Sequence, residues 1–377
     1  MVEIVPHGTL DYAELDRLNL SPDELHVFSS NINPYGPPTA IVDAVHAAAT
    51  GPNLARYPDR LSAVLRAQIA DYHGVAPETI VVGNGTADLM WMVGLLHVQA
   101  RRQPHGHPQG STSRRVVILE PTFGEYANVA SLVDTPVTPV ALPGWERTDA
   151  GQYMPSDRSL AVCLAELAEA APDVVFLCNP NNPTGELFDA ETVDAMIGAA
   201  PNALWVIDEA YMEFVETPWS AANLIDTHAV IVLRSMTKDF ALGGIRLGYL
   251  VAAPETAQPI QTAQPPWNVN VLAQIAGETA FESLVWRQAT LAQLRADTAA
   301  LQAALRMVGL QPRPTTTNYF LTPTPDPGAL RTYLLGKRIM IRDCTSFGLP
   351  DFFRVATQTP ADNALLVEAL AEYAPPD

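Results

Sequence analysis

The stretch AVIVLRSMTK, residues 229–238, places a lysine just past a run of five apolar residues. The run predicts a buried strand, because a parallel strand covered on both faces reads as a continuous apolar segment. Lys238 then lies beyond the carboxyl end of that strand, where open α/β sheets place their ligand sites. A partly desolvated lysine there can lose its proton and attack a carbonyl, whereas arginine cannot. Taken alone, the segment also fits a surface lysine whose stem lies along apolar groups.

Lysine is rare in this chain, which gives Lys238 more weight. The 22 basic residues include only one other lysine, Lys337, which sits beside an arginine in a segment typical of a solvated helix end. Three more apolar runs also end in polar or aromatic clusters, namely RVVILE before PTFGEY, VVFLCN before PNNPTG and ALWVIDE before AYMEF. Alternating strands and helices of this kind predict a parallel sheet. We therefore expect the four strand ends to form one site.

A separate turn, Gly83-Asn84-Gly85-Thr86-Ala87, follows the short apolar run IVV and precedes a helical pattern. Glycines allow close backbone approach, and a helix N-terminus attracts anions. Together with Ser235, Thr237 and Arg246, this turn predicts a phosphate site. It matches neither the G-x-G-x-x-G fingerprint nor the P-loop, which argues against dinucleotides and nucleoside triphosphates.

The other strand ends supply groups suited to an aromatic cofactor. Asp208 is a carboxylate that burial would penalise unless a cation paired with it. Tyr211 and Asn182 offer hydrogen-bond donors, and Phe123 offers a flat apolar face. A phosphate site, a carboxylate for a ring cation, donors for a phenolic oxygen, a stacking ring and an amine together predict pyridoxal 5′-phosphate.

These segments also resemble a known family along nearly the whole chain. SMTK…GGIRLGY, NPNNPTG, DEAY, PTFGEY, GNGT and FFRVAT are similar to motifs of the fold-type I aminotransferase superfamily. The N-terminal PHG, FSSNINPYGPP, PPWNVN and IMIRDC look most like threonine-phosphate decarboxylases and histidinol-phosphate aminotransferases. The resemblance implies an α/β fold: a large domain with a mostly parallel seven-stranded sheet between helices, plus a smaller α+β domain.

The resemblance also implies roles for individual residues. Lys238, Asp208 and Tyr211 would be catalytic, with Lys238 bonding covalently to the cofactor. The cofactor contacts it implies are Gly85, Thr86, Ala87, Phe123, Asn182, Asp208, Tyr211, Ser235, Thr237, Lys238 and Arg246, with Tyr57 reaching the cofactor of a partner subunit. The substrate contacts it implies are Arg354, Arg342, His7 and Asn33. A homodimer with shared active sites and a small amino-acid-like substrate, phosphorylated in the named relatives, follow as expectations.

The reaction is open at this stage. The decarboxylases usually carry an aromatic residue and a proline where this chain has Asp239 and Gly243, and His7-Gly8-Thr9 replaces their usual His-Gly-Gly. We place decarboxylation first and transamination with 2-oxoglutarate second. Elimination or cyclisation, with Asp239 or Glu14 as an extra base, is a weaker alternative. A cofactor-binding protein without activity is the alternative outside enzymes, but every catalytic position is filled.

Composition narrows the partners and the compartment. The chain has 377 residues, is 48% hydrophobic and carries a net charge of −19, which argues against nucleic acid and anionic membranes. The sequence shows no leader or membrane-spanning run, and three cysteines are too few for a disulfide framework, so we expect a cytoplasmic protein. Residues 100–114 have loop composition, so His105 and His107 are interpreted as loop residues and no metal site is predicted.

The domain division expected from the pattern has three parts. Residues 1–38 form an N-terminal arm and part of the small domain, residues 39–270 form the cofactor-binding domain, and residues 271–377 form a linking helix and the small domain. The linking helix is expected over residues 276–308, where apolar residues recur at heptad-like spacing.

Overall fold

The fold is taken from a computed structural model, which describes residues 10–98 and 114–373. A seven-stranded sheet lies at its centre, with the spatial order β2-β10-β9-β8-β7-β3-β4. The strands are β2 (Ile80–Gly83), β3 (Val116–Glu120), β4 (Val137–Ala141), β7 (Val174–Cys178), β8 (Leu204–Asp208), β9 (Val230–Ser235) and β10 (Gly248–Ala252). Strand β10 pairs antiparallel with both neighbours, and the remaining pairings are parallel. The predicted α/β class with a mostly parallel sheet is confirmed.

Helices cover both faces of this sheet, which explains why its strands are apolar throughout. In β9, Val230 and Val232 pack into one hydrophobic cluster, while Ile231 and Leu233 pack into another on the opposite face. The first cluster takes residues from α2 (Thr39–Thr50), α3 (Ala63–His73), α6 (Leu160–Ala170), α7 (Ala190–Ala199) and α9 (Val271–Glu282). The second takes residues from α4 (Thr86–Val93), α5 (Glu125–Leu132) and α8 (Pro254–Ala263).

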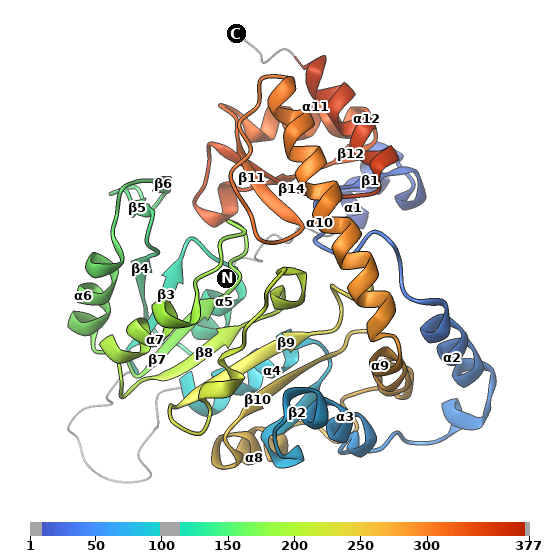
Figure 1. The fold of residues 1–377 in the computed structure, drawn as a ribbon, viewed down its shortest axis with the longest axis vertical. Helices are drawn as coiled ribbons and strands as arrows, with labels where there is room; N and C mark the ends of the chain where they lie inside the picture. The colour runs from blue at the N-terminus through green and yellow to red at the C-terminus, as the bar shows by residue number, and fades with distance from the viewer. Residues whose placement is uncertain (1–9, 99–113, 374–377) are drawn as a thin grey trace.

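A smaller α+β unit lies beside one end of the large sheet, at the top of Figure 1. Its antiparallel sheet has the order β11-β14-β13, formed by β11 (Tyr319–Pro323), β14 (Phe352–Ala356) and β13 (Arg342–Asp343). Its helices are α10 (Leu284–Met307), α11 (Pro327–Gly336) and α12 (Pro360–Ala371). Helix α10 runs from the large sheet into this unit. The hairpin β5 (Trp145–Arg147) and β6 (Tyr153–Pro155) extends from the large unit.

The described part of the N-terminal segment contains regular structure. It forms α1 (Tyr12–Leu18), capped by Asp11, whose side chain accepts hydrogen bonds from two backbone N–H groups of the first turn. Strand β1 (His26–Val27) pairs in parallel with β12 (Ile339–Met340). The described part of the arm therefore joins the small unit, while the predicted domain boundaries at 38/39 and 270/271 stay predictions.

The prediction of one helix over residues 276–308 is wrong in detail. The chain forms two helices, α9 and α10, separated at Ser283. The Ser283 hydroxyl donates to the carbonyl of Thr279 at 3.1 Å, and its backbone leaves the helical region at ψ 18°. A serine that bonds back to the preceding turn competes with the helical ladder and bends or interrupts a helix. The apolar spacing continues across the break, so periodicity alone did not reveal it.

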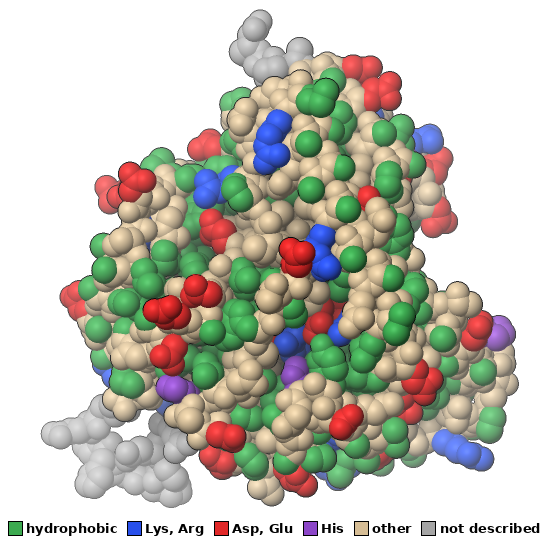
Figure 2. Space-filling model, in the orientation of Figure 1, with side chains coloured by type: hydrophobic (Ala, Val, Ile, Leu, Met, Phe, Trp, Pro, Cys, Tyr) green, Lys and Arg blue, Asp and Glu red, His purple; other side chains and the backbone are tan. Residues whose placement is uncertain are grey.

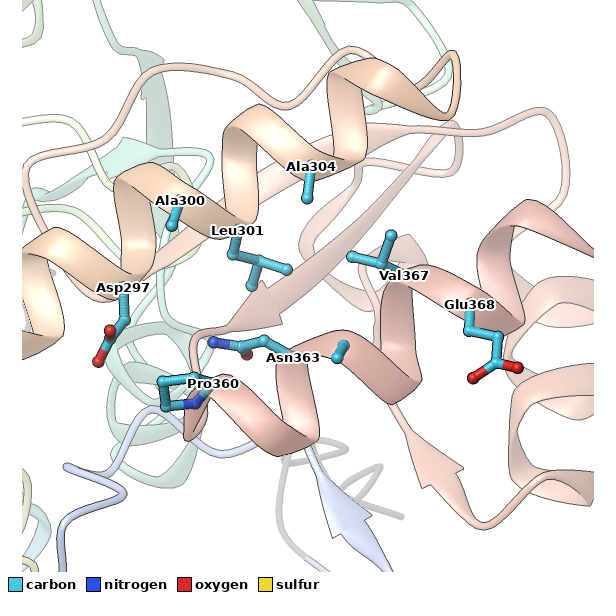
Figure 3. A pocket seen from close by; sticks show the side chains of 9 residues that line it. Asp297, Ala300, Leu301, Ala304, Pro360, Asn363, Val367 and Glu368 are labelled. Carbon is cyan, nitrogen blue, oxygen red and sulfur yellow. The ribbon is translucent and has the colours of Figure 1, made fainter.

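An apolar groove on the surface is unrelated to the strand ends. It measures about 440 Å³ and lies between α10 and α12, where Leu301, Ala304 and Val367 face one another (Figure 3). On the face drawn in Figure 2, acidic side chains are dispersed and the basic ones do not gather into a patch. Among the described residues, no helix has both the length and the apolar character needed to cross a membrane.

Candidate active site

A pocket of about 140 Å³ opens at the carboxyl ends of β7, β8 and β9, beside the first turn of α4. Its lining consists of Thr86, Ala87, Met90, Phe123, Tyr126, Cys178, Asn182, Asp208, Ala210, Tyr211, Ser235, Thr237, Lys238 and Arg246. Every predicted cofactor contact except Gly85 and Tyr57 is in this lining. The structure thus brings residues from the predicted strand ends together.

Lys238 follows β9, and its side chain reaches into the pocket. Burial, and then the positive charges of Arg354 and Arg246, lower the pKa of its amine to about 8 against the opposite effect of Asp208. Its backbone carbonyl accepts a hydrogen bond from the backbone N–H of Asn33 at 2.9 Å. A lysine in this state has a substantial neutral fraction near neutral pH, as a nucleophilic amine requires.

Asp208 ends β8 and is almost completely buried. Its Oδ2 accepts a hydrogen bond from the Tyr126 hydroxyl at 2.8 Å, and its Oδ1 accepts one from the Ala210 backbone N–H at 3.0 Å. Burial raises the pKa of Asp208, while the bond from Tyr126 acts in the opposite direction. This carboxylate therefore has two neutral donors, and a cation in the pocket would offset its burial.

The anion cradle lies between the start of α4 and the segment after β9. Gly85, at φ 80°, turns the chain from β2 into α4, and a Cβ there would lie 2.8 Å from Arg246 Nη2. The hydroxyls of Ser235 and Thr237 are 2.7 Å apart. Arg246 itself donates to the Gly243 carbonyl at 3.1 Å. Hydroxyls, a guanidinium and helix N–H groups at one point are the donors that a phosphate uses.

The groups predicted for the cofactor's ring and phenolic oxygen also line the pocket. The Tyr211 hydroxyl accepts a hydrogen bond from Asn31 Nδ2 at 3.2 Å, and Asn182 Oδ1 accepts one from Arg354 Nη1. Phe123 meets Tyr126 edge to face, with ring centroids 5.8 Å apart.

Two predicted substrate residues, Arg342 and Arg354, are opposite each other in the β13–β14 pair. Both guanidinium groups lie over the ring of Phe347, at 5.1 Å and 6.0 Å from its centroid. Arg354 also donates to the Ser29 carbonyl at 2.7 Å, and its buried Nε has no partner among the described residues. Burial, and then the charge of Arg354, lower the pKa of Arg342 to about 10. An anion between the two arginines would relieve their repulsion.

The remaining predicted residues are placed differently. Both N–H groups of the Asn33 amide are used inside the protein, donating to the Asp239 carbonyl at 2.9 Å and to the Thr290 hydroxyl at 3.1 Å. Asn33 therefore holds residues 236–239, which we call the Lys238 segment. Its side-chain amide has no N–H group left for a substrate. Tyr57 is 79% exposed, stacks on Trp267 and does not line the pocket of its own chain. His7 lies outside the described residues.

Several residues in or beside the pocket were not predicted from the sequence. Tyr126 is in the quoted segment PTFGEY, but only the fold shows that its hydroxyl reaches Asp208. Asn31, two residues before Asn33, contacts Tyr211. Met90, Cys178 and Ala210 fill the wall and carry no polar signal that a motif could reveal. No cluster of three or more metal-binding side chains occurs in residues 10–98 and 114–373.

The residues present fit pyridoxal 5′-phosphate by their chemistry: a buried carboxylate whose hydrogen-bond donors among the described residues are both neutral, an amine with a lowered pKa and an anion cradle around a glycine. When bound, this cofactor supplies an aldehyde carbon for covalent attachment and an electron-accepting ring. Together with the doubly covered sheet and the small unit, the site defines a fold-type I pyridoxal phosphate enzyme.

Comparison with known proteins agrees. The chain belongs to the aminotransferase class I and II family, whose model matches residues 23–370. That family is pyridoxal phosphate-dependent, so the predicted cofactor is confirmed, as is an enzyme of the transaminase or decarboxylase type.

Relatives of both predicted kinds are found. The chain is 33% identical over 350 residues to a histidinol-phosphate aminotransferase of Symbiobacterium thermophilum, covering 92% of this chain and 90% of the relative. It is 33% identical over 369 residues to a threonine-phosphate decarboxylase of Salmonella typhimurium, covering 94% and 92%. The crystal structure of the histidinol-phosphate aminotransferase from Clostridium acetobutylicum superposes with a TM-score of 0.77 at 26% identity, covering 91% of this chain and 97% of that one.

Proposed function

We propose that this protein acts at the Cα atom of an amino acid or amine that carries a distal phosphate, most closely in the manner of a threonine-phosphate decarboxylase. The observation that carries the proposal is the pair Arg342 and Arg354. They are opposite each other in one β-pair, and Arg354 also reaches Asn182 in the pocket lining. Guanidinium groups bind phosphate and carboxylate through two parallel hydrogen bonds, so the pair suits a substrate with two anionic groups.

Each residue of the pocket would then have its own role. Lys238 would bond covalently to the cofactor and carry a proton to or from Cα at its Nζ atom. Asp208, supported by Tyr126, would stabilise positive charge on the ring nitrogen. Tyr211 and Asn182 would bond the phenolic oxygen, and Thr86, Ser235, Thr237 and Arg246 would hold the phosphate. Phe123 would cover one face of the ring.

Decarboxylation and transamination differ in which Cα bond is broken, namely the one perpendicular to the conjugated plane. If Arg354 grips the substrate carboxylate in that plane, the carboxylate is protected and the C–H bond breaks, which is transamination. If both arginines bind the distal phosphate, the carboxylate is free to leave as carbon dioxide. Histidinol phosphate has no carboxylate, so it would place its phosphate near the same arginines. Transamination of this type is the second candidate, supported by the relatives.

The weaker elimination alternative gains no support from the geometry. Both Glu14 oxygens accept hydrogen bonds from Arg331, at 2.7 Å and 2.5 Å. Asp239 faces Arg287 and does not line the pocket. Neither carboxylate has the position of an extra base beside Lys238.

The test compares two substrates on the cofactor-loaded protein. Carbon dioxide release from O-phosphothreonine supports decarboxylation, and glutamate formation from histidinol phosphate and 2-oxoglutarate supports transamination. Lys238→Ala is the control, since it removes the covalent and proton-transfer groups together and should lower turnover by orders of magnitude. Turnover of neither compound would reject both named substrates.

We also propose a homodimer with shared sites and a cytoplasmic location. The exposed pair of Tyr57 and Trp267 supports the first, since large exposed aromatic groups are typical of interfaces. The three buried cysteines, all free, fit the second.

A further inference from the structure

A second group of charged side chains adjoins the Lys238 pocket. It surrounds a small cavity that shares Ser235 with the pocket and is lined by Asp239, the residue after Lys238. Its charged members come from distant parts of the chain: Glu209, Glu213, Arg234, Asp239 and Arg287. All of these side chains are buried or nearly so. Burying a charge costs free energy unless an opposite charge compensates it, so the net charge of this group affects the stability of the region around it.

Four ion pairs connect the group. Arg234 Nε lies 2.9 Å from a Glu209 oxygen, and its Nη1 lies 2.9 Å from a Glu213 oxygen. Arg287 contacts Glu213 at 3.1 Å and Asp239 at 3.3 Å. Three carboxylates thus face two guanidinium groups. The group is neutral only when it holds one proton.

The other titratable side chains around it do not supply the missing charge. Tyr72, which bonds Glu213 and Arg287, and Tyr249 both have pKa values raised by burial, so both stay neutral. His73 bonds the Tyr249 hydroxyl at 2.9 Å, and burial lowers the pKa of the imidazole to about 4. At neutral pH the imidazole is uncharged as well.

Asp239 is the carboxylate with the weakest support. Glu209 accepts hydrogen bonds from the Ser220 hydroxyl and the Ala221 backbone N–H in addition to its ion pair. Asp239 has the longest of the four ion pairs, and its buried Oδ1 has no hydrogen-bond partner among the described residues. Burial raises the pKa of Asp239 to about 6, against the opposite effect of Arg287. When the group takes up a proton, Asp239 is the carboxylate whose contacts favour holding it.

The backbone around Asp239 is anchored to two other elements. Asn33, from the N-terminal segment, donates from its backbone to the Lys238 carbonyl and from its side chain to the Asp239 carbonyl, each at 2.9 Å. The same side chain bonds Thr290 on α10, one turn after Arg287. The ion pair between Asp239 and Arg287 and the hydrogen bonds of Asn33 therefore connect the Lys238 segment to the same part of α10.

We propose that Asp239 is a titratable positioning residue for Lys238, whose ionisation loosens the attachment of the Lys238 segment to Asn33 and α10. Opening of the segment would expose Asp239 to water, where its carboxyl has an ordinary, lower pKa. By linkage, opening becomes easier as pH rises through the interval between the two pKa values, because the opened state has released its proton. The importance of this role rests on the proposed function of Lys238.

Hydrogen exchange tests the proposal without requiring turnover, so its failure is distinct from a failure of the proposed function. Exchange is followed in a peptide covering residues 233–243, in the cofactor-loaded and cofactor-free protein, from pH 5 to 8. After correction for intrinsic exchange, protection in the wild-type protein should fall about tenfold over this range, as a pKa change from the ordinary value to about 6 requires. In Asp239→Asn, protection should not depend on pH.

A matched control is Asp297→Asn. Asp297 is also buried, lies on α10 like Arg287 and accepts hydrogen bonds from Tyr35 and Gln293, but within the described part of the chain it forms no hydrogen bond or ion pair with the Lys238 segment. It should keep the wild-type pH dependence. Wild-type protection that is flat or rises with pH, a persisting slope in Asp239→Asn, or an equal loss in Asp297→Asn would overturn the proposal. If Asp239→Asn does not fold, Asp239→Ser provides the uncharged variant and the wild-type pH series still decides the sign.

Discussion

Lys238 and Asp208 share one physical property, since burial moves each toward its uncharged form. The pKa of the amine falls and the pKa of the carboxyl rises, for the same reason. Each also favours the charged form of the other, because the opposite charges act against the effect of burial. A cofactor that brings a phosphate and a ring cation changes this balance, which is why both residues are informative targets.

Asp208→Asn should lower kcat by roughly 10²-fold, because the amide keeps the shape but no longer stabilises positive charge on the ring nitrogen. Cofactor should remain bound through its phosphate contacts, which can be checked by absorbance after gel filtration. Tyr126→Phe is the matched control: it removes one hydrogen bond to Asp208 and keeps the charge, so its effect should be about 1 kcal/mol, or several-fold. Unchanged kcat in Asp208→Asn would make this carboxylate structural.

The lowered pKa of Lys238 predicts how cofactor attachment depends on pH. Only the neutral amine attacks a carbonyl, so the rate of covalent attachment to the cofactor-free protein should rise with pH and level off above about 8. An ordinary lysine has a pKa of about 10.4 and would give a rate that rises until about pH 10. Stopped-flow absorbance measures the rate. A rise that continues past pH 10 would show that burial and the two arginines do not act on this amine.

At the scale of elements, the strands were predictable because burial on both faces leaves a sequence signal that does not depend on distant contacts. The end of β8 at Asp208 and the position of Lys238 shortly after β9 followed from it, as did the turn at Gly85 after β2. Contacts between segments far apart in sequence left no such signal. Asn31 and Asn33 have the same side chain, yet one bonds Tyr211 and the other holds the Lys238 segment. Arg287, inside a regular helical pattern, gave no indication of its ion pair with Asp239.

Gly248, the first residue of β10, allows β10 to lie close to the start of α4 and to β9 beside the anion cradle. A Cβ at this position would lie 2.8 Å from the Thr86 backbone nitrogen and 3.0 Å from the Arg234 carbonyl oxygen. Because backbone atoms cannot move aside like a flexible side chain, Gly248→Ala should destabilise the fold by about 1–3 kcal/mol. It should also weaken phosphate binding, since it displaces the start of α4. Thermal unfolding and cofactor titration measure the two effects.

Gly198, in helix α7, is the matched control. A Cβ there meets no atom within 4 Å, so Gly198→Ala should be neutral or stabilise the protein by up to about 1 kcal/mol. Cofactor affinity should not change. Equal behaviour of the two alanine variants would mean that the close approach at Gly248 is relieved without cost.

For the whole molecule, the main consequence of the fold is that the site draws on both units. The large sheet supplies Lys238, Asp208 and the cradle, while Arg354 of the small unit, opposite Arg342 in its strand pair, donates a hydrogen bond to the lining residue Asn182. Helix α10 passes between them and touches the Lys238 segment through Arg287 and Thr290. A movement of the small unit would therefore change both the positions of the two arginines and the contacts that α10 makes with Asp239 and Asn33.

Assembly gives the last prediction. Tyr57 is 79% exposed and does not line the pocket of its own chain, and exposed Leu54 and Val64 lie near it in sequence. If Tyr57 instead bonds the cofactor phosphate of a second copy, Tyr57→Phe should weaken cofactor binding by about 1–1.5 kcal/mol, roughly five- to tenfold. Sedimentation should show a dimer for the wild-type protein and the variant alike.

Mixed dimers separate a shared site from a site within one chain. One subunit carries Tyr57→Phe and the other carries Lys238→Ala. If sites are shared, the intact Lys238 is paired with the intact Tyr57 of the other subunit, so half the sites should bind cofactor covalently with wild-type affinity. If Tyr57 serves its own chain, the only subunit with Lys238 has lost the hydroxyl, and every covalent site should show the weakened affinity. A stable and fully active monomer would remove the basis for either result, because Tyr57 would then have no second copy to reach.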